Sequence, residues 1–193
     1  MKYIISRYNH DISWIKDYTD DYVLYDRSEV PLAGSIIVPN MGSDIYDKFT
    51  YMIDNYDNLP DVAVYTKANL FKYITKEEFD EVKDNKSFTP LLSKNHEEKP
   101  GVSYYSPDGV YNEINNLWFV KKKTKKIDEL VSFLGTGENS YMRFAPGSNY
   151  ILPKENILKH PKEFYQKLNS FLEYDVYPPE AWIIERNLYE IWH

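Results

Sequence analysis

Residues 35–65 carry the strongest indication of the fold; they read S-I-I-V-P-N-M-G-S-D-I-Y-D-K-F-T-Y-M-I-D-N-Y-D-N-L-P-D-V-A-V-Y. The apolar runs at 35–38 and 61–65 each predict a strand. Between them Ser43 caps a helix whose apolar residues recur at helical spacing: Ile45, Phe49, Met52, Ile53 and Tyr56. The turns at 39–42 and 57–60 separate these elements. The stretch therefore predicts a strand–helix–strand unit.

Toward the N-terminus, two more strands are predicted at 3–6 and 22–25, with a short helix opened by residues 9–11 between them. Four strands alternating with helices indicate a mainly parallel α/β sheet with right-handed crossovers. Ligands of such sheets lie beyond the carboxyl ends of the strands. The four polar loops that follow these ends, at 7–11, 26–28, 40–44 and 66–69, are therefore expected to line one site.

The rest of the chain is less regular until its last third. A capping box at 75–78 predicts a short helix, residues 84–110 are expected to form a long loop, and 111–120 a strand. A helix is predicted at 127–134, ending at Gly135. A turn at 144–148, a strand at 150–152 and helices beginning at 160–161 and 178–179 follow. The final helix is apolar nearly all round, so Glu185 and Arg186 inside it require partners or a function.

Composition limits the classes of function. With 193 residues, 42% hydrophobic content and a net charge of −7, a single globular domain is expected and nucleic-acid binding is not. The basic run at 121–126 is interpreted as a solvated strand end or loop, or as a phosphate or membrane contact. No cysteine is present, and no apolar run approaches the ~18 residues of a membrane span or the length of a signal peptide. We therefore expect a cytoplasmic protein without a membrane span.

Five short motifs stand in order along the chain. They are S-R-Y-N-H-D at 6–11 followed by Trp14, V-P-N-M-G-S-D at 38–44, Y-D-N-L-P-D at 56–61 with V-Y-T-K at 64–67, F-A-P-G-S-N-Y at 144–150, and E-R-N-L-Y at 185–189. They resemble a widespread family of domains of unknown function. In that family the corresponding motifs are A-R-Y-N-E-D then W, L-P-N-x-G-R-E, Y-D-N-L-P-D before V-F-L-Q, F-x-P-G-A-x-F, and E-R-L-W.

That family is similar to glycosyltransferases of the GT-A type, including small viral ones. The resemblance implies an α/β, GT-A-like, three-layer fold with a mainly parallel central sheet, in one domain over residues 1–193. It implies a nucleotide-binding half at 1–70 and a sugar and acceptor half at 71–193. The implied function is transfer of a sugar, hexosyltransferase-like, from a nucleotide-diphosphate donor to a sugar or other hydroxyl acceptor.

The resemblance also implies site residues. Those for the nucleotide and donor are Ser6, Arg7, Tyr8, Asn9, Asp11, Asp26, Asn40, Gly42, Lys67 and Asn69. Those for the sugar and acceptor pocket are Pro146, Gly147, Ser148, Asn149 and Arg186. Glu185 is the expected catalytic base, because partial desolvation by Trp182 and Trp192 would raise its pKa toward a useful range.

The chain departs from the GT-A pattern where a metal would bind. Enzymes of that type hold Mn²⁺ or Mg²⁺ with D-x-D after the fourth strand, because two carboxylates can bind a cation that bridges the diphosphate. Here the segment reads Y-T-K-A-N at 65–69, and no D-x-D occurs in the chain. Either Lys67 neutralises the phosphates itself, or Asn69 acts as a weak ligand to Mn²⁺ or Mg²⁺.

Several of these residues have a second interpretation. Arg7 could form a structural ion pair, Asp11 could cap the helix after it, and Gly42 and Gly147 could serve turns. Glu185 could pair with Arg143 or Arg186. At the level of the whole protein, the alternatives are an inactive nucleotide-sugar or carbohydrate-binding module of the same fold, and a structural or interaction protein.

Overall fold

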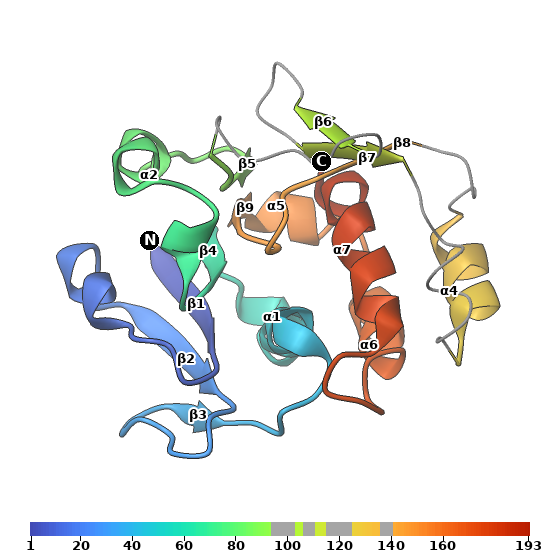
Figure 1. Cartoon of the computed structure of the whole chain (residues 1–193), viewed down its shortest axis with the longest axis horizontal. Helices are drawn as coiled ribbons and strands as arrows, with labels where there is room; N and C mark the ends of the chain where they lie inside the picture. The colour runs from blue at the N-terminus through green and yellow to red at the C-terminus, as the bar shows by residue number, and fades with distance from the viewer. Residues whose placement is uncertain (94–102, 106–110, 115–124, 136–140) are drawn as a thin grey trace.

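Six strands form the central sheet of the computed structural model, in the order β3-β2-β1-β4-β9-β5 (Figure 1). The structure describes residues 1–93, 103–105, 111–114, 125–135 and 141–193. The strands of this sheet are β1 (Lys2–Arg7), β2 (Tyr22–Asp26), β3 (Ile36–Ile37), β4 (Val62–Lys67), β5 (Thr89–Pro90) and β9 (Tyr150–Pro153). The pairs β1–β2, β1–β4 and β2–β3 are parallel, whereas β9 is antiparallel to both β4 and β5. The predicted mixed α/β fold with a mostly parallel sheet is thus confirmed.

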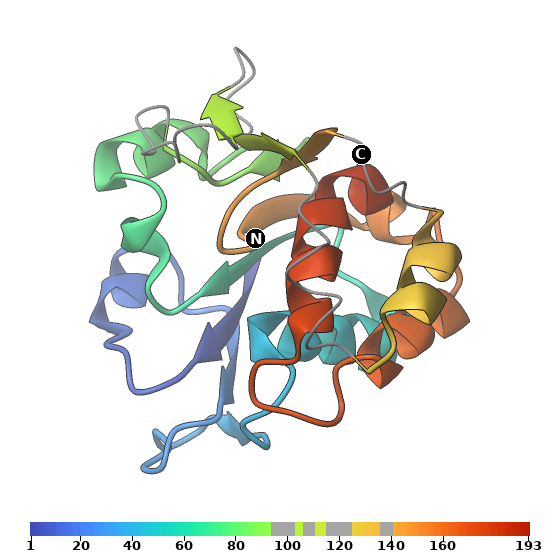
Figure 2. The same cartoon turned by 45° about the vertical axis from the view of Figure 1, so that its right-hand side comes forward.

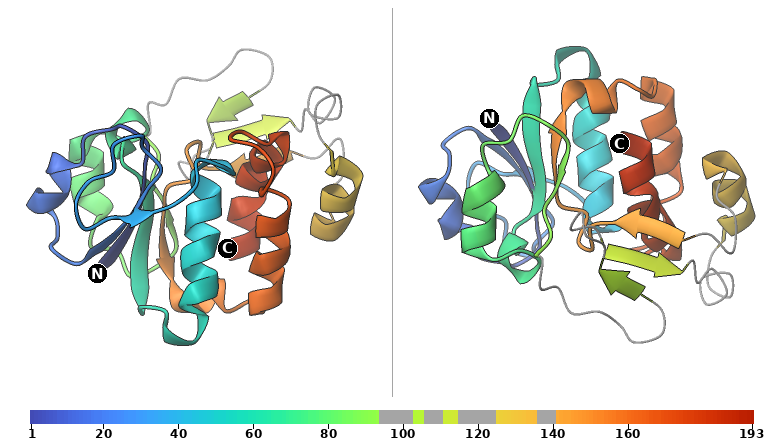
Figure 3. Two further views of the ribbon diagram at one scale, coloured as in Figure 1. Left: turned by 90° about the horizontal axis from the view of Figure 1, so that it is seen from below. Right: turned by 90° about the horizontal axis from the view of Figure 1, so that it is seen from above.

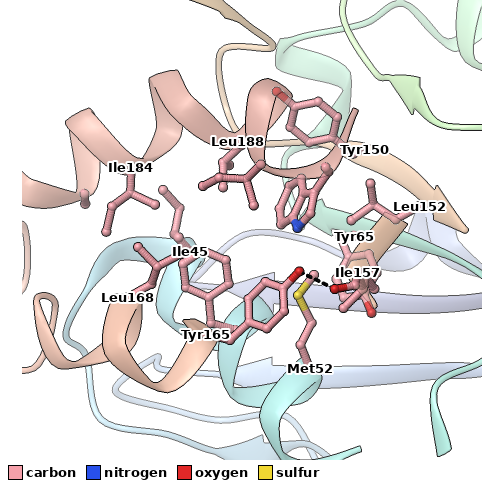
Figure 4. Packing of buried hydrophobic residues seen from close by; sticks show 14 of the residues in the cluster. Ile45, Met52, Tyr65, Tyr150, Leu152, Ile157, Tyr165, Leu168, Ile184 and Leu188 are labelled. Carbon is pink, nitrogen blue, oxygen red and sulfur yellow. Dashed lines mark hydrogen bonds between the residues drawn. The ribbon is translucent and has the colours of Figure 1, made fainter. Parts of the chain in front are cut away.

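Helices cover both faces of this sheet (Figure 3). One face carries α1 (Ser43–Asp54), α6 (Lys162–Ser170) and α7 (Pro179–Trp192), and the other carries η1 (Ser13–Asp17), η3 (Leu70–Lys72) and α2 (Lys76–Val82). Side chains of α1, α6 and α7 form the larger core with residues of β4 and β9, as Figure 4 shows for Met52, Tyr65, Tyr150, Tyr165 and Leu188. This core draws on both the first 70 residues and the last 50.

A second, three-stranded antiparallel sheet lies next to α7 (Figure 2). It consists of β6 (Ser103–Tyr105), β7 (Tyr111–Ile114) and β8 (Tyr141–Phe144). On the outer side of α6, Phe133 of α4 (Ile127–Leu134) stacks on Phe164 with ring centroids 5.2 Å apart. The remaining short elements are η2 (Tyr56–Asn58) and α5 (Lys154–Ile157).

The local signals predicted some elements closely and others poorly. The capping box on Thr75 and Glu78 is formed, and α4 ends at Gly135 in the left-handed conformation. The predicted third strand is reduced to two exposed edge residues, Ile36 and Ile37, and the predicted first helix is a five-residue 3-10 helix. Within the expected 84–110 loop lie β5 and β6, because sheet pairing orders extended segments that have no periodicity of their own.

Two further predictions lie partly outside the described residues. The strand expected at 111–120 is present as β7 over its first four residues, and the structure describes none of 115–124. Of the basic run, Lys125 and Lys126 are described, and both backbone N–H groups donate to Glu180 Oε1. In the described part of the chain, no helix combines the length and the apolar character that crossing a membrane requires.

Candidate functional site

A cavity of about 140 Å³ lies where the carboxyl ends of β1 and β4 meet the N-terminus of α1. Its lining comes from loops far apart in the sequence, as the parallel-sheet argument predicts. The lining residues are Ser6, Arg7, Tyr8, His10, Arg27, Asn40, Ser43, Asp44, Lys67, Asn69, Tyr73 and Tyr177. Six of them are among the predicted nucleotide-binding residues: Ser6, Arg7, Tyr8, Asn40, Lys67 and Asn69.

The other six lining residues were not identified as site residues from the sequence. His10, Arg27, Ser43 and Asp44 lie within the predicted loops at 7–11, 26–28 and 40–44, although none of them was assigned a role of its own. Tyr73 and Tyr177 carry no such signal. Tyr73 follows η3, and Tyr177 belongs to the loop between α6 and α7, which reaches the cavity because it bonds to the start of α1.

That loop changes the role expected of Gly42. The backbone N–H groups of Gly42 and Ser43 donate to the carbonyls of Asp175 and Val176 at 2.9 and 3.1 Å. Gly42 is buried with φ at +69°, and a Cβ there would lie 2.6 Å from Cβ of Tyr46. Gly42 is not among the lining residues: its conformational freedom serves the turn into α1, in line with the alternative interpretation, and its N–H is already bonded.

Asp44 lines the cavity and is paired with two lysines. Its Oδ1 lies 3.0 Å from Nζ of Lys67, and its Oδ2 accepts from Nζ of Lys48 and from Oγ of Ser148. Ser43 Oγ also donates to Oδ1, at 3.0 Å. Burial alone would raise the pKa of Asp44, but the two lysines outweigh it and hold that pKa far below its usual range. Asp44 is thus a permanent anion with both oxygens occupied.

The two lysines around Asp44 differ in exposure. Lys48 is fully buried; its Nζ donates to Ser148 Oγ at 2.7 Å, and burial lowers its pKa against the attraction of Asp44. Lys67 keeps 22% of its side chain exposed and lies 5.5 Å from the ring centroid of Tyr73. Burial would lower the pKa of Lys67, but the charges of Asp44 and Glu185 raise it. Lys67 is therefore the cation that this cluster presents to the cavity.

Two arginines add positive charge to the wall. Arg7 donates from Nη1 to Asp26 Oδ2 at 2.7 Å and from Nε to the carbonyl of His10 at 2.8 Å. Arg27 donates from Nη1 to the carbonyl of Met41 and pairs through Nη2 with Asp47 at 2.5 Å. Each guanidinium is thus fixed by a buried carboxylate behind it, which orients it without occupying all of its five N–H donors.

Asp26 does not face the cavity. Its carboxylate is fully buried and accepts hydrogen bonds from Arg7, from the Ser28 backbone N–H at 3.0 Å and from the Leu32 backbone N–H at 3.0 Å. Burial would raise the pKa of Asp26, but these bonds lower it. Asp26, which was expected among the nucleotide and donor residues, orders the loop after β2 and positions Arg7, which does line the cavity.

Asn9 and Asp11 also lie outside the lining. Asn9 adopts φ of +57°, and its N–H donates to Ser28 Oγ at 2.7 Å. Asp11 accepts from the backbone and side chain of Ser13, which satisfies donors at the start of η1. Asp11 thus forms an Asx turn just before η1, whose N-cap residue is Ile12 and has no side-chain cap.

None of the residues predicted for the sugar and acceptor pocket is among the lining residues of the cavity. Ser148 and Asn149 are fully buried; Asn149 Oδ1 accepts from the Lys67 backbone N–H at 2.9 Å and from Thr66 Oγ1. Gly147 has φ of +89°, and a Cβ there would lie 2.7 Å from Cε1 of Tyr73. Pro146 at the start of this segment is half-buried. The segment therefore holds the backbone of Lys67 through Asn149 and packs against the Tyr73 ring through Gly147.

Glu185 contacts this segment. Its Oε1 accepts from the Gly147 backbone N–H at 2.8 Å, and its Oε2 lies 3.9 Å from Nη1 of Arg186. Arg186 donates to the Trp182 carbonyl and places its guanidinium 5.0 Å from the ring centroid of Phe144. Of the two tryptophans expected near Glu185, Trp182 is exposed and Trp192 is buried. The side chain of Arg143 lies outside the described residues.

Glu185 is not a lining residue, yet its charge acts on Lys67 and Lys48.

The described residues do not fit a divalent cation. Such ions take oxygen ligands, and Asp44 is the only carboxylate in the lining. Because two lysines and two serines occupy its oxygens, a cation would have to displace existing ion pairs. Asn69, the expected weak ligand, lines the cavity without a second carboxylate beside it.

The buried pair of Arg27 and Asp47 makes one pH-dependent prediction. Burial raises the pKa of Asp47 more than the charge and hydrogen bond of Arg27 lower it, and the pKa of Asp47 is about 6 as a result. The folded state then binds a proton on Asp47 between pH 4 and 6 that the unfolded chain has released, so the contribution of Asp47 to the free energy of unfolding should fall as pH rises through this window. We expect the carboxyl carbon of Asp47, assigned in NMR spectra by comparison with Asp47→Asn, to titrate near pH 6. A midpoint near 4 would contradict this.

Comparison with known proteins adds no family to this description. A scan of family models, a search of curated proteins and a search of solved structures found no significant match to the chain.

Proposed function

We propose that the protein is a GT-A-like glycosyltransferase that uses a nucleotide-diphosphate sugar. The observation that carries the proposal is the cavity at the carboxyl ends of parallel strands, lined by the cationic side chains of Arg7, Arg27 and Lys67. This is the place where α/β sheets bind ligands, and the lining charge suits a polyanion. The order of the sequence motifs supports the same family.

Tyrosine rings at the rim support a nucleotide as the ligand. Tyr8 is 38% exposed and Tyr177 is 66% exposed, and they belong to separate loops that both line the cavity. An exposed aromatic ring beside fixed cations can stack on a base while the cations bind phosphate oxygens. A cavity of about 140 Å³ accommodates only part of a nucleotide-sugar, so the base or sugar extends over this rim.

Glu185 is the proposed base for the acceptor hydroxyl. One of its oxygens is bonded to Gly147, and the other lies 3.9 Å from Nη1 of Arg186. The side chain is 18% exposed, which leaves the second oxygen available to an acceptor. In this proposal Gly147 and Glu185 bring the acceptor to the side of the cavity where Lys67 holds the donor.

Calorimetry with UDP-, GDP- and dTDP-sugars tests the binding, and release of free nucleotide in the presence of sugar acceptors tests the transfer. We expect one donor class to bind at micromolar to millimolar strength. No heat with any donor would reject the proposal.

Replacing Tyr177 with alanine should weaken binding of that donor about tenfold, because one stacking contact contributes roughly 1–3 kcal/mol. Tyr22→Ala is the matched control: Tyr22 is also exposed, but it lies at the start of β2, away from the cavity. Equal affinities of both variants and the wild type would show that Tyr177 does not contact the donor.

The second candidate is a binding module without catalysis. It is favoured by the position of Glu185 outside the lining, and by the occupied oxygens of Asp44, the one carboxylate that the described residues contribute to the lining. Such a module would bind the donor in calorimetry and release no nucleotide with any acceptor, whereas the transferase turns over.

A further inference from the structure

Lys67 occupies the end of β4, at the carboxyl edge of the sheet. The backbone there is held on both sides. On one side Lys67 is paired with Ser6 of the parallel strand β1, and on the other its N–H donates to Oδ1 of Asn149. Its ammonium is fixed by Asp44 at 3.0 Å, and 22% of its side chain remains exposed toward the cavity. A fixed and partly exposed ammonium is a preorganised site for phosphate oxygens.

Building on the proposed function, we propose that Lys67, with Arg7 and Arg27, neutralises the diphosphate of the donor in place of a divalent metal, so that nucleotide binding is independent of metal. An ammonium has three donors; one is directed to Asp44 and one to the Tyr73 hydroxyl, which leaves one for a phosphate oxygen. Arg7 and Arg27 also line the cavity, and each guanidinium has N–H donors beyond the one that it directs to Asp26 or Asp47. Three cationic side chains thus line the cavity, each already paired with one carboxylate (Asp26, Asp47 and Asp44), and the diphosphate would be a second anionic partner for each of them.

The role of Asp44 in this arrangement is to position Lys67. Asp44 is shared between a buried lysine and a partly exposed one, and Ser148 is bonded to both Asp44 and Lys48. The carboxylate therefore cannot bind a metal without breaking the buried cluster, and breaking a buried ion pair is strongly unfavourable. Its charge also maintains Lys67 in the protonated form at neutral pH.

The proposal is tested by titrating the full chain with UDP, GDP and dTDP, once in EDTA and once in Mn²⁺. We expect at least one diphosphate to bind with affinities that agree within about twofold in the two buffers. Binding that requires Mn²⁺ would overturn this proposal and leave the transferase proposal standing. No binding in either buffer would reject the transferase proposal and this one with it.

Variants of Lys67 separate its charge from its bulk. Lys67→Met should weaken nucleotide binding in EDTA by about 10–100-fold, because charge-assisted hydrogen bonds to phosphate are lost, whereas Lys67→Arg should retain most of the affinity. Lys72→Met, an exposed lysine of the neighbouring η3 outside the lining, should match the wild type. Unchanged affinity in a Lys67→Met variant whose circular dichroism spectrum is native would overturn the proposal.

Inorganic pyrophosphate distinguishes recognition of the diphosphate from recognition of the base. We expect it to compete with the nucleotide in EDTA, and the competition to be lost in Lys67→Met. If pyrophosphate does not compete with a bound nucleotide, the nucleotide is held through its base, and the proposed role of Lys67 is wrong.

Discussion

Replacing Lys48 with methionine should lower the free energy of unfolding by about 4 kcal/mol, because the change leaves Asp44 buried with one cation fewer. Lys48 is fully buried and links Asp44 to Ser148, whose hydroxyl lies 100 residues further along the chain. Methionine fills nearly the same volume, so the loss reports on charge and hydrogen bonding and not on a cavity. Urea unfolding followed by circular dichroism measures it.

Two further variants make this result interpretable. Lys16→Met changes an exposed lysine of η1 and should alter stability by less than about 0.5 kcal/mol. The double variant Asp44→Asn/Lys48→Met removes the anion that the single variant leaves behind, and should recover at least about 1 kcal/mol. A loss below about 1 kcal/mol in Lys48→Met would contradict the buried cluster.

Replacing Gly147 with alanine should lower the free energy of unfolding by about 3 kcal/mol and also weaken nucleotide binding. The residue has φ of +89°, which alanine adopts only with strain. The added Cβ would lie 2.7 Å from Cε1 of Tyr73 and 2.8 Å from Nδ2 of Asn149. Because Tyr73 lines the cavity and Asn149 holds the backbone of Lys67, the displacement would reach the cavity itself.

Gly135→Ala separates backbone strain from this contact. Gly135 also has a positive φ, of +67°, but a Cβ there would meet nothing within 4 Å. Its replacement with alanine should lower the free energy of unfolding by about 1 kcal/mol, through backbone strain alone, and leave nucleotide binding unchanged. Equal losses of stability in the two variants would show that the contact with Tyr73 has no effect.

The candidate site could be predicted in part from the sequence. The rule that ligands lie beyond parallel strand ends identified the loops that supply Arg7, Asn40, Lys67 and Asn69, and these residues do line one cavity. The rule could not separate Arg7, which lines the cavity, from Asp26 behind it, because both follow strand ends. Burial decides between them, and burial depends on how the loop after β2 folds over Asp26.

By itself the sequence determined the elements whose signals are local. The apolar spacing of α1, the capping box of α2, the glycine that ends α4 and the prolines that begin α7 act within a few residues. Only the tertiary structure decided that Asp44, Lys48 and Ser148 form one buried cluster and that Lys67 is its exposed member. The physical reason is range: capping and periodicity are properties of neighbouring residues, whereas the environment of a charge is set by whichever distant segments pack around it.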